Sequence, residues 1–154
     1  MPTYSHRQIG YYMIWSLVAV AVLFAWVHMS ALAEPASVDS GPNFAVSLLM
    51  LLILATIASF ATLTVSIDKT YLRLKFGWGV FHKKFALADI ASAKAVRNSW
   101  YHGLGIHYIW PGNVWVYNVS GFDAVELVMK NGKRVRIGTD EPQKLEQAIT
   151  STFG

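Results

Sequence analysis

The sequence predicts an α+β membrane protein, in which a transmembrane helical hairpin precedes a β-rich domain of about seven antiparallel strands and one C-terminal helix. Three observations support this prediction. Hydrophobic residues make up 54% of the 154-residue chain and charged residues only 14%, whereas soluble domains carry about 25% charged residues. Two long uncharged stretches lie in the first half. Alternating apolar and polar residues, the pattern of half-buried strands, recur through the second half.

Two apolar stretches are long enough to cross a bilayer. Residues 9–33 contain no Asp, Glu, Lys or Arg, and residues 44–67 contain neither a charged residue nor a histidine. A helix needs about 20 residues to cross the hydrocarbon core, where it satisfies its own backbone hydrogen bonds. We therefore expect two transmembrane helices, with small residues four apart, such as Ala21 and Ala25 or Ala55 and Ser59, permitting close helix approach.

The connection between the two spans predicts the orientation of the hairpin. Residues 34–43 contain two prolines, a glycine and two acidic residues but no basic one, which is typical of a turn. Basic residues flank the outer ends of the spans, among them Arg7 and Lys69. Because Lys and Arg concentrate on the cytoplasmic side, we expect a multi-pass protein of a bacterial inner membrane with both termini cytoplasmic. Residues 1–67 would form the hairpin and residues 68–154 the cytoplasmic domain.

Two features of the first span leave alternatives open. Residues 31–33, Ala-Leu-Ala, resemble a signal-peptidase site, although the apolar stretch before them is longer than a usual signal sequence. His28 is the one ionisable group in the two spans. We expect it to reach the interface near the helix end rather than to bind metal or haem. A redox or transport subunit built on His28 is the weaker alternative.

The second half of the chain reads as strands joined by turns. The expected strands are 70–76, 80–85, 91–97, 105–109, 114–119, 124–130 and 133–137. A three-residue loop at 130–132, with Gly132 left-handed, would align Val125 with Ile137 and Leu127 with Val135 on one face and Glu126 with Arg136 on the other.

The end of the chain predicts a helix that closes the sheet. Thr139 or Asp140 can cap it, and Pro142 suits its first turn. Leu145, Ile149 and Phe153 then form one apolar stripe.

Several local strings in this half resemble the bacterial pleckstrin-homology (PH)-like domains of small inner-membrane proteins. The resemblance spans about Ser66 to Phe153. The strings are Asp68-Lys69, Phe76-Gly77-Trp78-Gly79, Asp89-Ile90, Gly103-Leu104-Gly105-Ile106, Tyr117-Asn118-Val119-Ser120-Gly121 and Ile137-Gly138-Thr139-Asp140-Glu141-Pro142. The resemblance implies a PH-like fold after two spans. Some relatives act as assembly factors or scaffolds, and the resemblance brings no catalytic residue set.

The residues exclude most enzyme classes. The absence of cysteine removes thiolate nucleophiles, iron–sulfur ligation and the usual structural zinc sites. No nucleophile elbow or phosphate loop is present, and no carboxylates are paired in an expected cleft, since the start of the last helix explains Asp140 and Glu141. His102 and His107 lack the spacing of metal ligands, and no nucleic-acid-binding motif accompanies the basic residues. We expect no enzymatic activity, no cofactor, no metal and no nucleic acid.

Basic residues around the expected first β-hairpin form the candidate lipid-binding site. They are Lys69, Arg73, Lys75, Lys83 and Lys84. Cations beside a bilayer are attracted by anionic phospholipids, and in PH domains the first hairpin holds the basic headgroup site. Alternation places Arg73 and Lys75 on one face but Lys83 and Lys84 on opposite faces. A simple positive flank with a solvated strand face is the competing interpretation.

Six large aromatic residues within 18 positions form the candidate protein-interaction site. Trp100, Tyr101 and Trp110 are expected to be exposed, whereas Tyr108, Trp115 and Tyr117 are expected to fill the core. The leading functional hypothesis is an accessory or assembly subunit that docks on an integral membrane protein complex. A sensor of anionic lipid headgroups is the alternative, and a homo-oligomer stays open.

Overall fold

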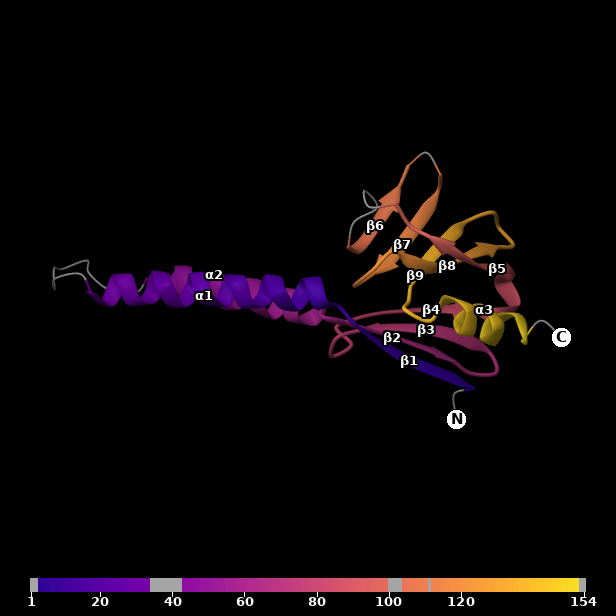
Figure 1. The fold of residues 1–154 in the computed structure, drawn as a ribbon, viewed down its shortest axis with the longest axis horizontal. Coiled ribbons are helices and arrows are strands. Elements are labelled where there is room, and N and C mark those ends of the chain that lie inside the picture. The colour runs from indigo at the N-terminus through magenta and orange to yellow at the C-terminus, as the bar shows by residue number, and fades with distance from the viewer. Residues whose placement is uncertain (1–2, 34–42, 100–103, 111, 153–154) are drawn as a thin grey trace.

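The structure is a computed structural model that describes residues 3–33, 43–99, 104–110 and 112–152. Figure 1 shows how its elements are arranged. In chain order they are β1 (Tyr4–Ile9), α1 (Tyr11–Ala33), α2 (Phe44–Ser59), β2 (Thr62–Ile67), β3 (Tyr71–Phe76), β4 (Phe81–Ala86), the short 3-10 helix η1 (Leu87–Asp89), β5 (Ile90–Arg97), β6 (Gly105–Ile109), β7 (Val114–Asn118), β8 (Asp123–Met129), β9 (Arg134–Gly138) and α3 (Pro142–Thr150).

The strands form two sheets that share one hydrophobic core. The four-stranded sheet has the order β1-β2-β3-β4, and the five-stranded sheet has the order β5-β8-β9-β7-β6. Side chains from both sheets meet in the core, and Leu145 and Ile149 of α3 close it. Phe153, the third residue of the expected stripe, lies outside the described residues. The α+β class is confirmed.

The expectation of purely antiparallel pairing is wrong at one position. β7 and β9 pair in parallel, from Val114↔Arg134 to Tyr117↔Ile137. β8 does not pair with β7 but lies beyond β9, next to β5. Since the chain reverses at β8 and again at β9, β9 runs in the direction of β7. The five-stranded sheet is therefore mixed.

The helical hairpin is inserted between two neighbouring strands. β1 passes into α1 through Gly10 alone, and α2 passes into β2 through Phe60 and Ala61. β1 and β2 pair antiparallel along their whole length, from Tyr4↔Ile67 to Ile9↔Thr62. The two helices therefore leave the sheet side by side, as the long connection of a single β-hairpin (Figure 1).

This insertion corrects the expected second span and the expected boundary after residue 67. α2 ends at Ser59, and residues 62–67 form β2, whose Leu63, Val65 and Ile67 are buried in the core. Residues 4–9, expected to lie before or at the start of the first span, are also a strand of this sheet. Both segments alternate in burial with period two, the pattern of strands.

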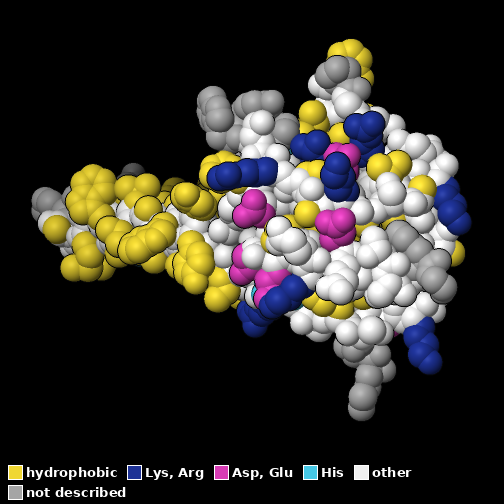
Figure 2. Space-filling view, turned by 45° about the vertical axis from the view of Figure 1, so that its right-hand side comes forward, with side chains coloured by type: hydrophobic (Ala, Val, Ile, Leu, Met, Phe, Trp, Pro, Cys, Tyr) yellow, Lys and Arg dark blue, Asp and Glu magenta, His cyan; other side chains and the backbone are white. Residues whose placement is uncertain are grey.

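Of the helices in the described part of the chain, α1 alone is long and apolar enough to cross a membrane. Its 23 residues extend about 34 Å at 1.5 Å per residue. α2 is a shorter apolar helix of 16 residues. Neither helix has a buried residue, and Figure 2 shows hydrophobic side chains covering the hairpin on the face in view.

Large side chains, not the expected alanines, form the contact between the helices. The partly buried positions recur every three or four residues along α1 and α2, and they include Leu17, Phe24 and Leu54. Ala21, Ala25 and Ala55 are exposed, so the expectation that they line the contact is wrong, whereas Ser59 is partly buried. A stripe of bulky residues at heptad-like spacing packs two helices as well as small residues do.

His28 belongs to this contact instead of reaching out to the interface. Its Nε2 lies 3.0 Å from the hydroxyl of Ser47 on α2, and its ring meets the edge of Phe24 at 4.4 Å between centroids. The contact between His28 and Ser47 fixes the axial position of α1 relative to α2, because a polar side chain in an apolar contact keeps its hydrogen-bond partner.

The C-terminal elements follow the sequence closely. Within the β8–β9 hairpin, Val125 pairs with Ile137, Leu127 with Val135 and Glu126 with Arg136, as expected. Gly132 is left-handed, with φ +81°, which confirms the three-residue loop. Helix α3 begins at Pro142, and Thr139 accepts a hydrogen bond from the backbone of Glu141, one residue before the helix, rather than from the helix itself.

Two close approaches hold the base of the hairpin against the β-domain. Gly10 donates a backbone hydrogen bond to Ala61 O at 2.8 Å, and a Cβ on Gly10 would lie 2.9 Å from Val119 O and 3.1 Å from Ala61 O. Gly77, with φ +47°, lies so close to the backbone of Ser59 that no side chain fits. Backbone atoms on both sides leave little room for relaxation.

We predict that Gly10→Ala destabilises this junction. The added methyl group must push apart backbone atoms of β1, β2 and the β7–β8 turn, which typically costs about 1–3 kcal/mol. Thermal unfolding of the full-length protein in a mild detergent measures the change. Gly112→Ala is the matched control, because its Cβ would meet a methyl group of Val114 at 3.3 Å, and a side chain can yield. Equal melting temperatures for both variants would contradict the prediction.

The start of β1 is tied to the start of α3. His6 Nε2 lies 2.5 Å from Asp140 Oδ1, and His6 Nδ1 lies 3.4 Å from Glu141 Oε2. Tyr4, two residues earlier, packs against the core. Burial and the nearby carboxylates of Glu141 and Asp140 raise the pKa of Tyr4 to about 12.

This shifted pKa predicts an alkaline loss of stability. Since the folded-state pKa of Tyr4 exceeds that of the unfolded chain, near 10, the stabilisation is complete below pH 10 and is lost as the pH rises toward 12. Tyr4→Phe removes the ionisable group, so its melting temperature should fall less steeply between pH 10 and 12 than that of the wild type. Parallel curves for the two proteins would contradict this assignment.

Candidate functional site

The outer face of the four-stranded sheet collects basic side chains from three strands, β1, β3 and β4. The register places Arg7, Thr64, Lys75 and His82 in one row across the sheet, and Ser5, Ser66, Arg73 and Lys84 in the next. Arg7, Arg73, Lys75, His82 and Lys84 are all exposed. We call Arg7, Arg73, Lys75 and Lys84 the basic face.

One aromatic ring and one carboxylate organise the basic face. The guanidinium carbon of Arg73 lies 5.6 Å, and Lys84 Nζ 5.2 Å, from the centre of the Tyr71 ring. Asp68 pairs with Arg73 and accepts hydrogen bonds from the backbone of Thr70 and Tyr71, at 2.8 and 2.7 Å. These backbone bonds first, and Arg73 second, hold the pKa of Asp68 below its usual value. Asp68 is the only acidic residue between positions 1 and 33 or 43 and 88, so the face keeps a positive charge.

The structure divides the five expected lipid-binding residues into three groups. Arg73, Lys75 and Lys84 share the basic face. Lys69 instead borders an open depression with Thr70, Leu87 and Lys130. Lys83 lies opposite Leu74 in the register and therefore on the inner side of β4.

Sequence reasoning missed Arg7 and His82 as members of this surface. In the sequence Arg7 is a basic residue that flanks the first apolar stretch. Only the pairing of β1 with β2 places it on the face of the sheet. His82 follows from the alternation of β4, which places it next to Lys75.

A cleft opens between the two sheets on the side of Lys83. It holds about 450 Å³, and its apolar lining consists of Phe81, Phe85, Ile106, Trp115, Tyr117 and Met129 together with Val135. The Tyr117 ring lies 6.3 Å from Phe81 and from Phe85 and 6.5 Å from Trp115, between ring centres. Burial raises the pKa of Tyr117, so its hydroxyl stays neutral. Lys83, Asn131 and Lys133 complete the lining.

The cleft exists because the four-stranded sheet covers only part of the wider sheet. Tyr117 is 5% exposed, whereas Trp115 and Tyr108, farther along the same face, are 41% and 43% exposed. The expectation that all three fill the core is therefore wrong for Trp115 and Tyr108. Their rings contact each other at a tilt of 50°, with 5.4 Å between centres.

The expected protein-interaction residues are only partly visible. Trp110, in the β6–β7 turn, is 80% exposed, which confirms its expected exposure. Trp100 and Tyr101 lie outside the described residues, as does His102. Two further exposed apolar residues, Trp78 and Val80, occupy the β3–β4 turn at the base of the hairpin.

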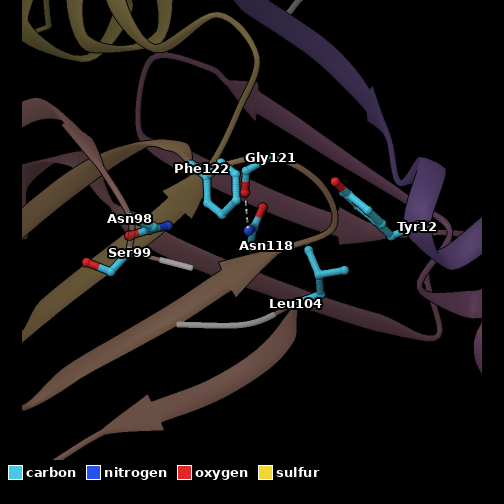
Figure 3. A pocket seen from close by; sticks show the side chains of 7 residues that line it. All are labelled: Tyr12, Asn98, Ser99, Leu104, Asn118, Gly121 and Phe122. Atoms are coloured by element: carbon cyan, nitrogen blue, oxygen red, sulfur yellow. Dashed lines mark hydrogen bonds between the residues drawn. The ribbon is translucent and has the colours of Figure 1, made fainter. Parts of the chain in front are cut away.

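A small cavity of about 180 Å³ lies where α1 meets the β-domain. Figure 3 shows Tyr12 directing its hydroxyl toward the β7–β8 turn, where Asn118 donates to Gly121 O. Asn98 lies on the opposite side. Its side chain is buried and accepts from Arg136, while its Nδ2 has no hydrogen-bond partner among the described residues. Polar groups thus border this cavity, and none of the described lining residues carries a charge.

The described residues contain no group of three His, Asp or Glu side chains placed to hold a metal ion. Comparison of the chain with models of protein families and with curated proteins gives no match. The features that indicate a function are therefore the helical hairpin, the basic face and the inter-sheet cleft.

Proposed function

We propose that the protein is a non-enzymatic accessory subunit of a membrane protein complex, anchored by its helical hairpin and docked through its basic face. One observation carries the proposal: both helices grow directly out of paired strands of the sheet that bears the basic face. A domain held by two such connections cannot rotate freely about a linker, so this face keeps one orientation relative to the hairpin.

The hairpin supplies the anchor. α1 matches the thickness of the hydrocarbon core, about 30 Å. α2 with Phe60 and Ala61 is slightly short, a mismatch that a bilayer accommodates at small cost. Exposed side chains such as Trp15, Leu23 and Leu49 need an apolar surrounding. Lipid or the helices of a partner can provide it, and we propose that both helices are inserted.

The direction of the strands favours a protein partner over a flat membrane surface. In Figure 1 the strands of the four-stranded sheet continue roughly along the direction of the two helices, starting at the base of the helical hairpin. If the helices cross the membrane, the plane of the basic face lies along the membrane normal. Its side chains then point parallel to the membrane surface rather than toward it. A neighbouring subunit with an acidic extramembrane surface fits this placement, because complementary charges guide and orient association.

The orientation in the cell follows from the same charges. Arg7, Lys69 and the basic face all lie at the domain end of the hairpin, whereas the opposite connection, residues 34–43, has no basic residue. By the preference of basic residues for the cytoplasmic side, the domain and both termini are proposed to be cytoplasmic in a bacterial inner membrane. β1 begins and α3 ends on the domain side, far from the hairpin tip (Figure 1).

Charge reversal tests the docking surface. Arg73→Glu with Lys84→Glu exchanges two residues that oppose each other in the β3–β4 register. Because juxtaposed like charges cost several kcal/mol, we expect at least about tenfold less membrane partner after purification in mild detergent, measured by quantitative mass spectrometry.

Lys130→Glu with Lys144→Glu is the matched control, since it makes the same charge change at exposed positions outside the basic face. Thermal unfolding checks that all variants are folded. A wild-type protein that purifies without any membrane partner contradicts the proposal. Partner recovery that depends on added anionic phospholipid, and not on these charges, would favour the lipid-headgroup alternative.

A further inference from the structure

The inter-sheet cleft combines an apolar interior with two cations, Lys83 and Lys133, that form no ion pair with any acidic residue in the described part of the chain. We propose that it binds a single-chain anionic lipid, with the hydrocarbon chain among the rings around Tyr117 and the anionic headgroup at Lys83 and Lys133. The proposal goes beyond the docking function, because the cleft and the basic face lie on opposite sides of β4.

Lys83 lies on the inner side of β4, among residues that face the core. Phe81, Lys83 and Phe85 alternate along the inner side of β4, facing Phe76, Leu74 and Leu72 in the register. This is the side on which core residues lie, yet Lys83 is exposed and takes part in no ion pair within the described residues. An inward lysine can protect an edge strand from aggregation. That role, however, does not require a second cation from another sheet.

Lys133 provides that second cation. It lies at the start of β9, on the other side of the cleft, and it is also exposed without an ion-pair partner in the described chain. None of the described residues that line the cleft is acidic. Two ammonium groups that approach one opening from two sheets attract one anionic group and would repel a cationic ligand.

The interior fits a chain rather than a polar molecule. Its rings and side chains are apolar apart from the rim residues and the neutral hydroxyl of Tyr117. The volume of about 450 Å³ is within the range of small-molecule sites, about 300–1,000 Å³. Burying a hydrocarbon chain among these rings removes apolar surface of both from water.

A second cavity lies between the cleft and the base of the hairpin. Ile106 lines the cleft, and it also lines a cavity of about 350 Å³ bordered by Met13, Ile57 and Phe60. The side chain of Ile106 therefore lies between the cleft and a cavity next to the first turn of α1 and the last turn of α2. With the hairpin in a bilayer, this cavity lies near the membrane surface, and a rotation of the Ile106 side chain would open a route from the leaflet to the cleft.

Photolabelling of the full-length protein tests the site directly. The probe is palmitate carrying a diazirine in its chain, added to protein in nanodiscs of zwitterionic phospholipid. Trypsin then separates the two regions of interest, because no Lys or Arg lies within residues 8–68 or within residues 98–129, so that cleavage after Lys69 and Lys130 releases the peptides 8–69 and 98–130. The first peptide holds the hairpin, and the second holds Ile106, Trp115, Tyr117 and Met129.

We expect labelling of the 98–130 peptide at these four residues, suppressed by excess palmitate but not by hexadecanol, which has the chain without the charge. Labelling confined to residues 8–69 would overturn the proposal, as would equal competition by hexadecanol. Suppression by apolar peptides but not by palmitate would assign the cleft to a protein segment instead and would equally overturn it. All of these measurements use the wild-type protein, so their outcome does not depend on whether a variant folds.

Adjacent lysines on β4 supply the matched variants. Lys83→Glu should reduce labelling of the 98–130 peptide about tenfold, because a charge-assisted contact becomes a repulsion, while recovery of the membrane partner stays at the wild-type level. Lys84→Glu makes the same charge change one residue away on the opposite side, and it should reduce partner recovery but keep the labelling. Loss of labelling in Lys84→Glu, or full labelling in Lys83→Glu, would overturn the lipid site and leave the docking test unaffected.

Discussion

The antiparallel pairing of β1 with β2 is the constraint on which the rest of the structure depends. An ordinary β-hairpin joins such strands through two to five residues, whereas here the connection contains the two helices α1 and α2. Pairing from Tyr4↔Ile67 to Ile9↔Thr62 fixes the spacing of the two helix ends. Gly10 and Gly77 then let the backbones of the sheet, the hairpin and the β7–β8 turn approach closely. Movement of the hairpin against the β-domain must break these contacts.

Rigidity at the base gives the two surfaces of β4 separate environments. The outer side belongs to a flat sheet face with Tyr71 between Arg73 and Lys84. The inner side borders the larger sheet, whose aromatic residues extend beyond the cover that β4 provides. A charge on the outer side is solvated and available to a macromolecule. A charge at the rim of the cleft meets a much less polar surrounding, in which an unpaired cation gains more from an anionic ligand.

The sequence predicts the second half of the fold much better than the first. The full alternation of β3 and the turn residues between the later strands predict these elements, and Gly132 determines the register of the last hairpin. β2 has an equally clear alternation of Thr and Ser with Leu63, Val65 and Ile67, but no charge separates it from α2. A mean hydropathy taken over a long window therefore does not separate strand β2 from helix α2. β1 is hidden for the opposite reason, because its polar residues Ser5, Arg7 and Gln8 look like an unstructured flank. Its role depends on pairing with residues 53 to 63 positions away, and the local pattern holds no such information.

Long-range pairing also decides the candidate sites. Alternation alone places Lys83 and Lys84 on opposite sides of β4, but it does not tell which side faces the second sheet. Arg7 joins Lys75 across Thr64 only through two successive registers, and Lys133 meets Lys83 only through the packing of two sheets. Five basic residues that are one cluster in the sequence therefore become separate features in space. The basic residues of greatest functional interest are those that the fold brings to one surface from distant segments, since side chains clustered by sequence alone need not share a ligand.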